Sequence, residues 1–204
     1  MLTIVIQAGG QSRRMGQDKA LLPFLGQPLI QRVVRRVRHL ADEMLVTTNQ
    51  PDGYKFLGLP LIPDRIPDRG ALGGLYTALD SAHFPLVAVV ACDMPFVSPQ
   101  LLSAEIDRLS DLAIAAAIPR TAGGTEPFHA VYRREICLPA VEAAILADQW
   151  RVDAWYATAA IHFLDPAETR LSDPEGRAFW NVNTPEEFAE AEGIARDQEG
   201  KLSK

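Results

Sequence analysis

Residues 2–19, LTIVIQAGGQSRRMGQDK, decide the fold and give the first indication of chemistry. The apolar start, residues 2–6, is typical of a buried strand, and a turn containing Gly9 and Gly10 follows it directly. An apolar strand that runs into a glycine turn is the usual start of an α/β domain, in which ligands bind outside the carboxyl ends of the strands. The stretch therefore predicts a binding loop at one edge of a sheet.

This loop combines a flexible backbone with dense positive charge. Gly9 and Gly10 lack a Cβ, so backbone N–H groups can come close to an anion. Arg13 and Arg14 offer bidentate forks for phosphate oxygens, and Lys19 offers a compact point charge. The combination predicts a triphosphate site in which the three cations take part in catalysis, although a solvated basic turn is the alternative. The spacing fits neither the Walker A nor the Rossmann glycine pattern.

Along the rest of the chain, short apolar runs alternate with amphipathic stretches, which is typical of βαβ units. The runs that predict strands are residues 2–6, 43–48, 59–62, 86–91, 112–118, 128–132 and 161–164. The stretches that predict helices are residues 29–40, 75–82, 99–109, 138–146 and the segment from Pro185 onward. We therefore predict an α/β fold in three layers, with a mainly parallel sheet, as a single domain over residues 1–196 and a polar C-terminal tail over 197–204.

Composition narrows the class of protein. The 204 residues are 48% hydrophobic, enough for one substantial core, and the net charge of −6 argues against a general nucleic-acid binder. Cys92 and Cys137 form neither a metal-binding spacing nor a disulfide framework, and His129, alone in an apolar run, is expected to be packed. The apolar start is too short for a signal peptide or a membrane span. We expect a cytoplasmic protein with neither nucleic-acid nor membrane partners.

Polar side chains follow three of the predicted strands. Asp93 comes just after the apolar run 86–91, Asn49 follows the strand at 43–48, and Asp64 follows the short run at 59–62. A carboxylate at the end of a buried strand can bind Mg²⁺ while a triphosphate and water supply the other oxygens, so Asp93 is the predicted metal ligand. Each has an alternative role: Asp93 as a helix or turn cap, Asn49 as an ordinary turn residue at a strand end, and Asp64 as a surface pair with Arg65.

Two further segments are candidates for ligand contact. Gly73 lies in the glycine-rich stretch 70–74, which predicts either a close approach to a ribose or base or a tight helix entry. Asn181 and Asn183 flank Val182, so in an extended segment both amides face the same side. The alternative is that this segment caps the last helix.

The pattern A-G-G-x-S-x-R-M-G-x-D-K, from Ala8 to Lys19, resembles the signature loop of nucleotidyltransferases, and most closely that of the molybdenum cofactor guanylyltransferase family. Three more segments match the family in the same order, namely Cys92-Asp93-Met94-Pro95, Glu126-Pro127 with Ala130-Val131-Tyr132, and Asn181-Val182-Asn183-Thr184-Pro185-Glu186-Glu187. The resemblance implies a Rossmann-like nucleotidyltransferase fold. It also implies Mg²⁺-dependent transfer of GMP from GTP to molybdopterin, with release of pyrophosphate.

The resemblance also implies roles for individual residues. Asp93 is implied to bind magnesium, and Asn181, Asn183 and Arg151 are implied to lie near the pterin acceptor. The residues expected at the nucleotide are Gln7, Ala8, Gly9, Gly10, Lys19, Asn49, Asp64, Gly73 and Asp93. Gln7 departs from the family, which usually has leucine there, and its amide is placed to alter contacts with the base or ribose.

Partners and competing functions follow from the same resemblance. Other molybdenum cofactor biosynthesis proteins and molybdoenzymes are the expected protein partners. The competing functions are a cytidylyltransferase or another small-acceptor nucleotidyltransferase of the same fold, a non-catalytic nucleotide-binding partner, and a plain α/β interaction domain. The last leaves the cluster of Arg13, Arg14 and Lys19 unexplained.

Overall fold

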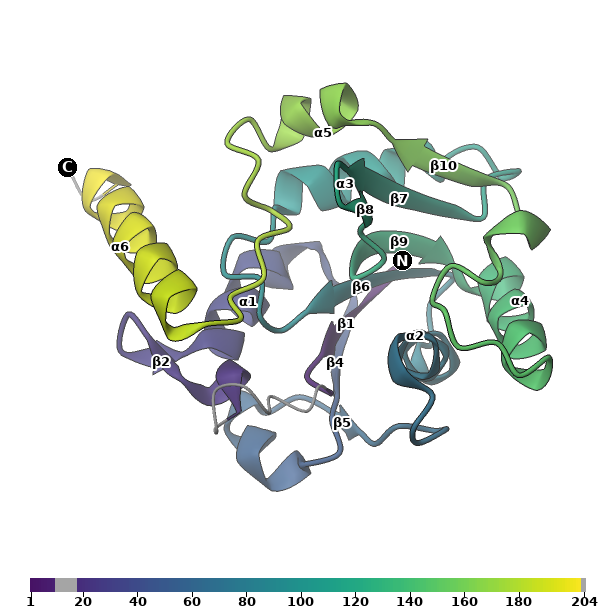
Figure 1. The fold of residues 1–204 in the computed structure, drawn as a ribbon, viewed down its shortest axis with the longest axis horizontal. Coiled ribbons are helices and arrows are strands. Elements are labelled where there is room, and N and C mark those ends of the chain that lie inside the picture. Colours follow the sequence, from purple (N-terminus) through teal and green to yellow (C-terminus); the bar gives the residue numbers. More distant parts are fainter. Residues whose placement is uncertain (10–17, 203–204) are drawn as a thin grey trace.

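The computed structural model describes residues 1–9 and 18–202, and its centre is a twisted sheet with helices on both faces (Figure 1). The predictions made for Gly10, Arg13 and Arg14 lie outside the described residues. Within the described residues, eight strands form the sheet in the order β10-β7-β9-β6-β1-β4-β5, with β8 paired to β7. Four of the pairings, β1 with β4, β1 with β6, β4 with β5 and β7 with β10, are parallel. This is the mainly parallel three-layer α/β fold that the sequence predicts.

The strands are short and their bounds follow the apolar runs. Those of the main sheet are β1 (Leu2–Gln7), β4 (Glu43–Thr47), β5 (Leu61–Ile62), β6 (Leu86–Ala91), β7 (Ala116–Thr121), β8 (Gly124–Thr125), β9 (His129–Arg133) and β10 (Ile161–Leu164). A separate hairpin consists of β2 (Pro23–Phe24) and β3 (Gln27–Pro28). β9 runs antiparallel to both of its neighbours, β6 and β7.

The helices connect these strands. The α-helices are α1 (Leu29–Val37), α2 (Gly70–Ser81), α3 (Pro99–Arg108), α4 (Arg134–Leu146), α5 (Pro166–Ser172) and α6 (Pro185–Leu202). The 3₁₀ turns are η1 (Lys19–Leu21), η2 (Arg38–Leu40), η3 (Pro51–Leu57) and η4 (Tyr156–Thr158). Ser98 accepts a hydrogen bond from the N–H of Leu101 and Pro99 occupies the first turn, so α3 begins where the capping pattern predicts.

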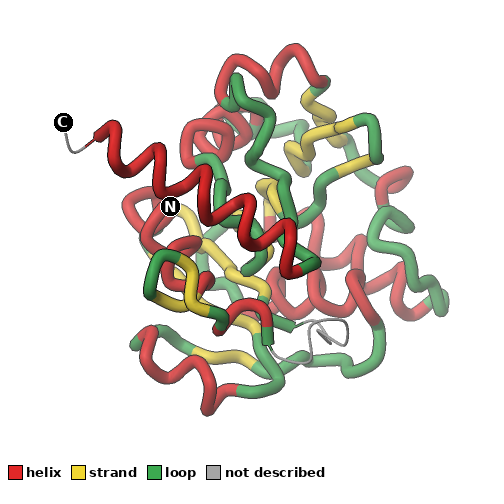
Figure 2. Tube along the Cα trace, turned by 60° about the vertical axis from the view of Figure 1, so that its left-hand side comes forward, coloured by secondary structure: helices red, strands yellow, loops and turns green. Residues whose placement is uncertain are grey.

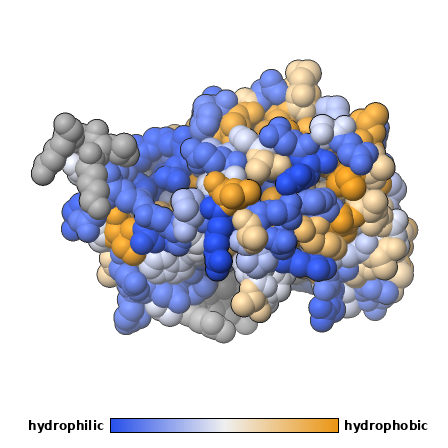
Figure 3. Space-filling view, turned by 90° about the horizontal axis from the view of Figure 1, so that it is seen from above, coloured by the Kyte–Doolittle hydropathy of each residue, from blue (hydrophilic) through white to orange (hydrophobic). Residues whose placement is uncertain are grey.

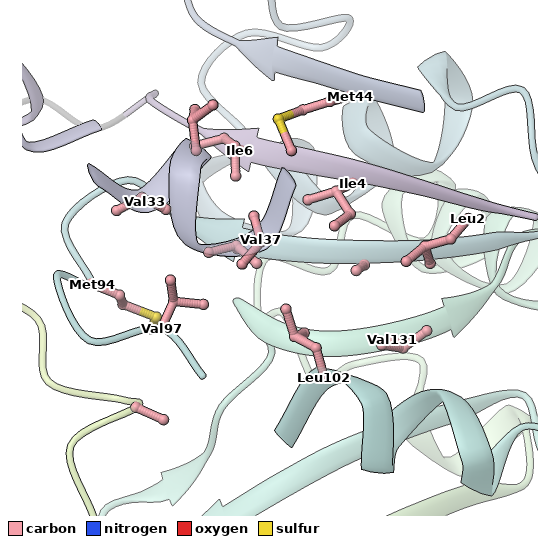
Figure 4. Packing of buried hydrophobic residues seen from close by; sticks show 14 of the residues in the cluster. Leu2, Ile4, Ile6, Val33, Val37, Met44, Met94, Val97, Leu102 and Val131 are labelled. Atoms are coloured by element: carbon pink, nitrogen blue, oxygen red, sulfur yellow. The ribbon is translucent and has the colours of Figure 1, made fainter. Parts of the chain in front are cut away.

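Alternating residues of β1 and β6 point into two cores, one on each face of the sheet. Ile4 and Ile6 pack with α1 and α3, as Figure 4 shows for Val33, Val37 and Leu102. Val5 and other odd-numbered positions pack with α2 and α4 on the opposite face. Because both faces are covered, the central strands are continuously apolar, and ligands can reach only the strand ends.

A third, smaller cluster joins the C-terminal helix to the hairpin. Phe24 of β2 meets Phe188 of α6 edge to face with ring centroids 5.4 Å apart, and the Leu25 N–H donates to Glu192. The views in Figures 1 and 2 both show α6 beside this hairpin, at one end of the molecule. Residues 197–202, assigned by sequence to a polar tail, are helical here, and Glu199 accepts a hydrogen bond from buried Arg32 at 2.6 Å.

Three element boundaries differ clearly from the predictions. α4 begins at Arg134 rather than residue 138. α2 begins at Gly70 rather than residue 75, since the glycine-rich stretch forms its first turns. β7 begins at Ala116 rather than residue 112, because Asp111 turns the chain by accepting hydrogen bonds from the N–H groups of Ala113 and Ile114. Leu112 is consequently exposed.

The surface is polar over most of the face seen in Figure 3, where hydrophobic residues are interspersed with hydrophilic ones. Large exposed apolar side chains are scattered over the chain, namely Met1, Phe56, Leu112, Leu146, Trp150 and Leu171. Among the described residues, we find no helix with both the length and the apolar character needed to cross a membrane.

Candidate active site

The carboxyl end of β1 lies between the ends of its two parallel neighbours. The Ala8 N–H donates to Thr47 O of β4 at 2.9 Å, and the Cys92 N–H donates to Gln7 O at 3.0 Å. These hydrogen bonds continue the sheet one residue past the strand on both sides. The segments that follow β1, β4 and β6 are thereby brought together at one edge, as expected for a doubly wound sheet.

Lys19 forms the centre of the most polar cluster at this edge. Its Nζ donates to Asp93 Oδ2 and to Asn183 Oδ1, both at 2.8 Å. The three residues come from η1, from the segment after β6 and from the segment before α6, so the fold joins distant parts of the sequence here. The Lys19 and Asp93 side chains are 16% and 18% exposed, which leaves them partly desolvated yet reachable by a ligand.

The segment with Asn183 is held against Asp93 by the backbone as well. The Val182 N–H donates to Asp93 O at 3.0 Å, and the Val182 side chain is fully buried. Asn183 Nδ2 donates to Asn181 O at 3.1 Å, while Asn181 Nδ2 donates to Phe179 O at 3.3 Å. Both nitrogens of the asparagine pair are therefore used within the segment itself.

The same segment caps α6. The Glu187 N–H donates to Thr184 Oγ1, and the Glu187 carboxylate in turn accepts from the N–H groups of Thr184 and Asn183. This is a reciprocal capping box with proline in the first turn. The capping alternative for this segment is thus realised alongside the contact between Asn183 and Lys19.

Asp93 has the chemistry expected of a magnesium ligand, with a single protein carboxylate at the strand end. Among residues 1–9 and 18–202, no group of three or more acidic, histidine or cysteine side chains gathers to hold a metal. Mg²⁺ is commonly bound by one or two carboxylates, with phosphate and water oxygens completing the octahedron. The partly exposed Asp93 carboxylate therefore fits the ion, provided that a nucleotide brings the other ligands.

Asn49 and Asp64 form a second polar pair at the ends of β4 and β5. Asn49 Nδ2 donates to Asp64 Oδ2 at 2.7 Å, and the Asp64 N–H donates to Asn49 Oδ1 at 3.0 Å. A Cβ placed on Gly9 would lie 3.8 Å from Asp64, so this pair borders the start of the loop. Arg65 pairs with Asp80 instead, which rules out the simple Asp64–Arg65 surface pair.

Gln7 turns its side chain toward the helix on the α2 face of the sheet. A Cβ on Gly74 would come within 3.1 Å of both Nε2 and Oε1 of Gln7, so a larger residue there would require the Gln7 side chain to shift. Gln7 Nε2 is buried and has no hydrogen-bond partner among the described residues. Gly73 is needed for packing, because a Cβ there would lie 2.7 Å from the Arg69 Cβ.

Arg151 and the two tryptophans near it in the sequence differ in how far their side chains are exposed. Arg151 is 83% exposed and binds Asp153 in a bidentate ion pair. Trp150 is half exposed beneath the Arg69 guanidinium, whose central carbon lies 4.3 Å from the ring centroid, whereas Trp155 is fully buried in the core of α2 and α4. Trp150 and Trp155, which bracket Arg151 in the sequence, therefore lie in different environments, and the contact of Arg151 with an acceptor stays a prediction.

Sequence reasoning missed Tyr54 and the full role of Asp18. Asp18 caps η1, with Oδ1 accepting the Ala20 N–H at 3.1 Å, and its Oδ2 accepts the Tyr54 hydroxyl at 2.5 Å. An aspartate just before a short turn was a readable capping signal. No local pattern marks Tyr54, which reaches this site only through the packing of η3 against η1.

The strand-end geometry defines a class of protein. A cation, a carboxylate and a polar pair at the carboxyl edge of a mainly parallel sheet, beside a glycine-containing loop, are suited to binding a nucleotide and its metal-bound phosphates. The site is therefore that of a nucleotide-binding α/β enzyme, in which positioning and charge neutralisation can activate a phosphoryl group.

Comparison with known proteins gives the family. Residues 4–160 match the MobA-like NTP transferase domain. A probable molybdenum cofactor guanylyltransferase of Pelotomaculum thermopropionicum is 35% identical over 96% of this chain and 94% of its own length. A molybdenum cofactor guanylyltransferase of Desulfosudis oleivorans is 32% identical over 96% of both chains. The chain therefore belongs to the MobA-like NTP transferases, and the family resemblance of its sequence is confirmed.

Solved structures agree with this assignment. The crystal structure of molybdopterin-guanine dinucleotide biosynthesis protein A from Archaeoglobus fulgidus superposes with a TM-score of 0.81 at 25% identity, covering 96% of this chain and 99% of that one. A 2-C-methyl-D-erythritol 4-phosphate cytidylyltransferase from Thermus thermophilus gives a TM-score of 0.69 at 17% identity, covering 94% and 98%. The second likeness shows that the fold is shared among nucleotidyltransferases.

Proposed function

We propose that this chain transfers GMP from GTP to molybdopterin, forming the guanine dinucleotide cofactor and releasing pyrophosphate. The observation that carries the proposal is the contact of Lys19 with Asp93 and Asn183 at 2.8 Å, which gathers three segments of the family signature at one strand edge. The guanylyltransferase relatives, similar over almost the whole chain, support the same activity.

The reaction requires only positioning and charge neutralisation from the protein. A phosphate oxygen of molybdopterin attacks the α-phosphorus of GTP, the bond to the bridging oxygen breaks, and the electron pair leaves with pyrophosphate. The nucleophile is already an anion, so no covalent intermediate is needed. The Lys19 ammonium offsets negative charge on the leaving pyrophosphate, and interactions of this kind lower the barrier when they are preorganised.

In this proposal Asp93 holds Mg²⁺, which when bound offsets phosphate charge as a Lewis acid. Asp93 Oδ2 accepts a hydrogen bond from the Lys19 ammonium, which offsets the negative charge of the carboxylate. Asn183 Oδ1 is a second hydrogen-bond acceptor for the Lys19 ammonium. If Asp93 binds a metal ion, the ammonium can therefore shift slightly and keep a protein acceptor instead of moving out into water.

The remaining contacts extend the nucleotide site along the edge. Ala8, Gly9 and the Asn49–Asp64 pair are proposed to bind the nucleoside, with Gly10, Arg13 and Arg14 from the signature loop binding its phosphates. Gln7 and Gly73 are proposed to border the base or ribose, and a polar contact there is supported by the buried Gln7 Nε2, which has no hydrogen-bond partner within residues 1–9 and 18–202. Asn181, Asn183 and Arg151 are proposed to contact the acceptor.

We further propose a cytoplasmic location, with other molybdenum cofactor biosynthesis proteins and molybdoenzymes as partners. Two free cysteines, Cys92 and Cys137, support a reducing compartment.

The direct test of the nucleotide is calorimetry with GTP, CTP and ATP in the presence of Mg²⁺. We expect clear preference for GTP. Preference for CTP would identify the chain as a cytidylyltransferase with the same mechanism, and the absence of binding to all three would contradict the proposal. A parallel titration without Mg²⁺ should show weaker binding of GTP if Asp93 and the triphosphate share the ion.

A further inference from the structure

Lys19 is the first residue of η1, a short turn that is held in place by hydrogen bonds involving residues outside it. Asp18 precedes it and caps η1, accepting the Ala20 N–H at its side chain and the Leu21 N–H at its backbone oxygen at 3.0 Å. These bonds set the direction in which the Lys19 side chain leaves the backbone. A lysine stem is long and has many rotamers, so a fixed starting direction matters for where its ammonium lies.

Tyr54 completes the hydrogen bonding of Asp18. Its hydroxyl donates to Asp18 Oδ2 at 2.5 Å, so both carboxylate oxygens are bonded, one to η1 and one to η3. The Tyr54 side chain is fully buried. Burial and the neighbouring carboxylate raise the pKa of Tyr54 well above its ordinary value, so the hydroxyl keeps its proton and remains a donor.

The packing of η3 against η1 makes this contact possible. A Cβ on Gly53 would lie 3.1 Å from Leu21 Cδ1, so the backbone just before Tyr54 approaches η1 closely. Tyr54 and Ala20 belong to the same buried cluster. The tyrosine is therefore closely packed, and its hydrogen bond to Asp18 can hold the turn in one position.

We propose that Tyr54 is a positioning residue for Lys19, acting through Asp18. The hydrogen bond holds η1 so that Lys19 Nζ reaches Asp93 and Asn183 together. This inference rests on the proposed function, in which the Lys19 ammonium stabilises the leaving pyrophosphate. A misplacement of about 1 Å in a catalytic group can lower the rate by a factor on the order of 100.

The test is a double-mutant cycle in the GMP-transfer reaction with Tyr54→Phe, Lys19→Met and the double variant. We expect Tyr54→Phe to lower kcat about tenfold, consistent with a lost hydrogen bond to a charged group, while KM for molybdopterin stays within about twofold. In the Lys19→Met background the same change should alter kcat by less than about twofold, since there is no ammonium left to position.

Tyr132→Phe is the matched control. The Tyr132 hydroxyl is also buried and donates to a backbone oxygen, Pro127 O, at 2.6 Å, but the ring packs in the cluster on the other face of the sheet. This variant should retain wild-type kcat, so that the loss in Tyr54→Phe cannot be ascribed to removing a buried hydroxyl as such.

Several results would overturn the inference. Wild-type rates in Tyr54→Phe would do so, as would an equal fold loss in the wild-type and Lys19→Met backgrounds. If Tyr54→Phe does not fold, Asp18→Asn tests the same contact from the other side, with the same expected coupling to Lys19. An inactive wild-type enzyme would refute the proposed function itself, whereas an active enzyme with an insensitive Tyr54 would refute only its positioning role.

Discussion

Glu105, buried beside His129, is predicted to make a contribution to stability that is lost as the pH rises through about 7. Glu105 of α3 and His129 of β9 are both fully buried, with Glu105 Oε1 3.0 Å from His129 Nδ1. The Ser98 N–H donates to His129 Nε2, so in the neutral ring Nδ1 carries the proton and donates to the carboxylate. Glu105 Oε2 has no partner among the described residues.

Burial raises the pKa of Glu105 from 4.5 to about 7, although the nearby His129 acts in the opposite direction. The folded protein therefore binds this proton more tightly than the unfolded chain does. The stabilisation is complete below pH 4.5 and is lost as the pH rises through about 7. A difference of about 2.5 pKa units corresponds to about 3 kcal/mol of unfolding free energy.

Glu105→Gln removes the titration and keeps an oxygen to accept the His129 proton. We expect urea denaturation to give similar unfolding free energies for the variant and the wild type at about pH 4, where the wild-type carboxyl is largely protonated in both the folded protein and the unfolded chain. At pH 8 the variant should be more stable by about 3 kcal/mol. A difference between the two proteins that stays constant from about pH 4 to pH 8 would refute the reasoning, since other titrating groups are common to both.

Three further variants test the site. Asp93→Asn should lower kcat by a factor on the order of 100 while retaining measurable GTP binding by calorimetry, and full activity would exclude Asp93 as the metal ligand. Asn49→Ala should weaken GTP binding about tenfold, because Asp64 loses two hydrogen bonds that orient it, and unchanged affinity would remove the pair from the nucleotide site. Arg151→Ala should leave the unfolding free energy close to that of the wild type, since the side chain is 83% exposed, but should raise KM for molybdopterin without changing KM for GTP; an unchanged KM for molybdopterin would contradict its acceptor role.

The ends of several strands were predictable because the local pattern of apolar and turn residues marks them. Apolar runs bounded by turn residues gave β1, β6 and β10 within one residue of their observed bounds. A parallel sheet then requires the residues after neighbouring strands to meet at one edge, so Asn49 and Asp64 could be expected near each other and Asp93 near the loop. The packed state of His129 followed from its apolar neighbours and is confirmed.

The contacts that the sequence did not reveal all depend on tertiary packing. Tyr54 reaches Asp18 across 36 residues, and Glu105 pairs with His129 across 24, with no spacing rule to connect them. The start of β7 was misplaced because a side chain at Asp111 overrides the apolar run that follows it. The hairpin of β2 and β3 was missed because its strands contain proline and are too short for a periodic signal.

The measurement that tests the central claim most directly is a turnover assay with molybdopterin, Mg²⁺ and GTP labelled at the α-phosphate. The account predicts that the label enters the pterin product, with one pyrophosphate released for each labelled product, and that CTP and ATP are poor substrates. Label that stays with free GTP, or preferential transfer from CTP, would contradict a guanylyltransferase.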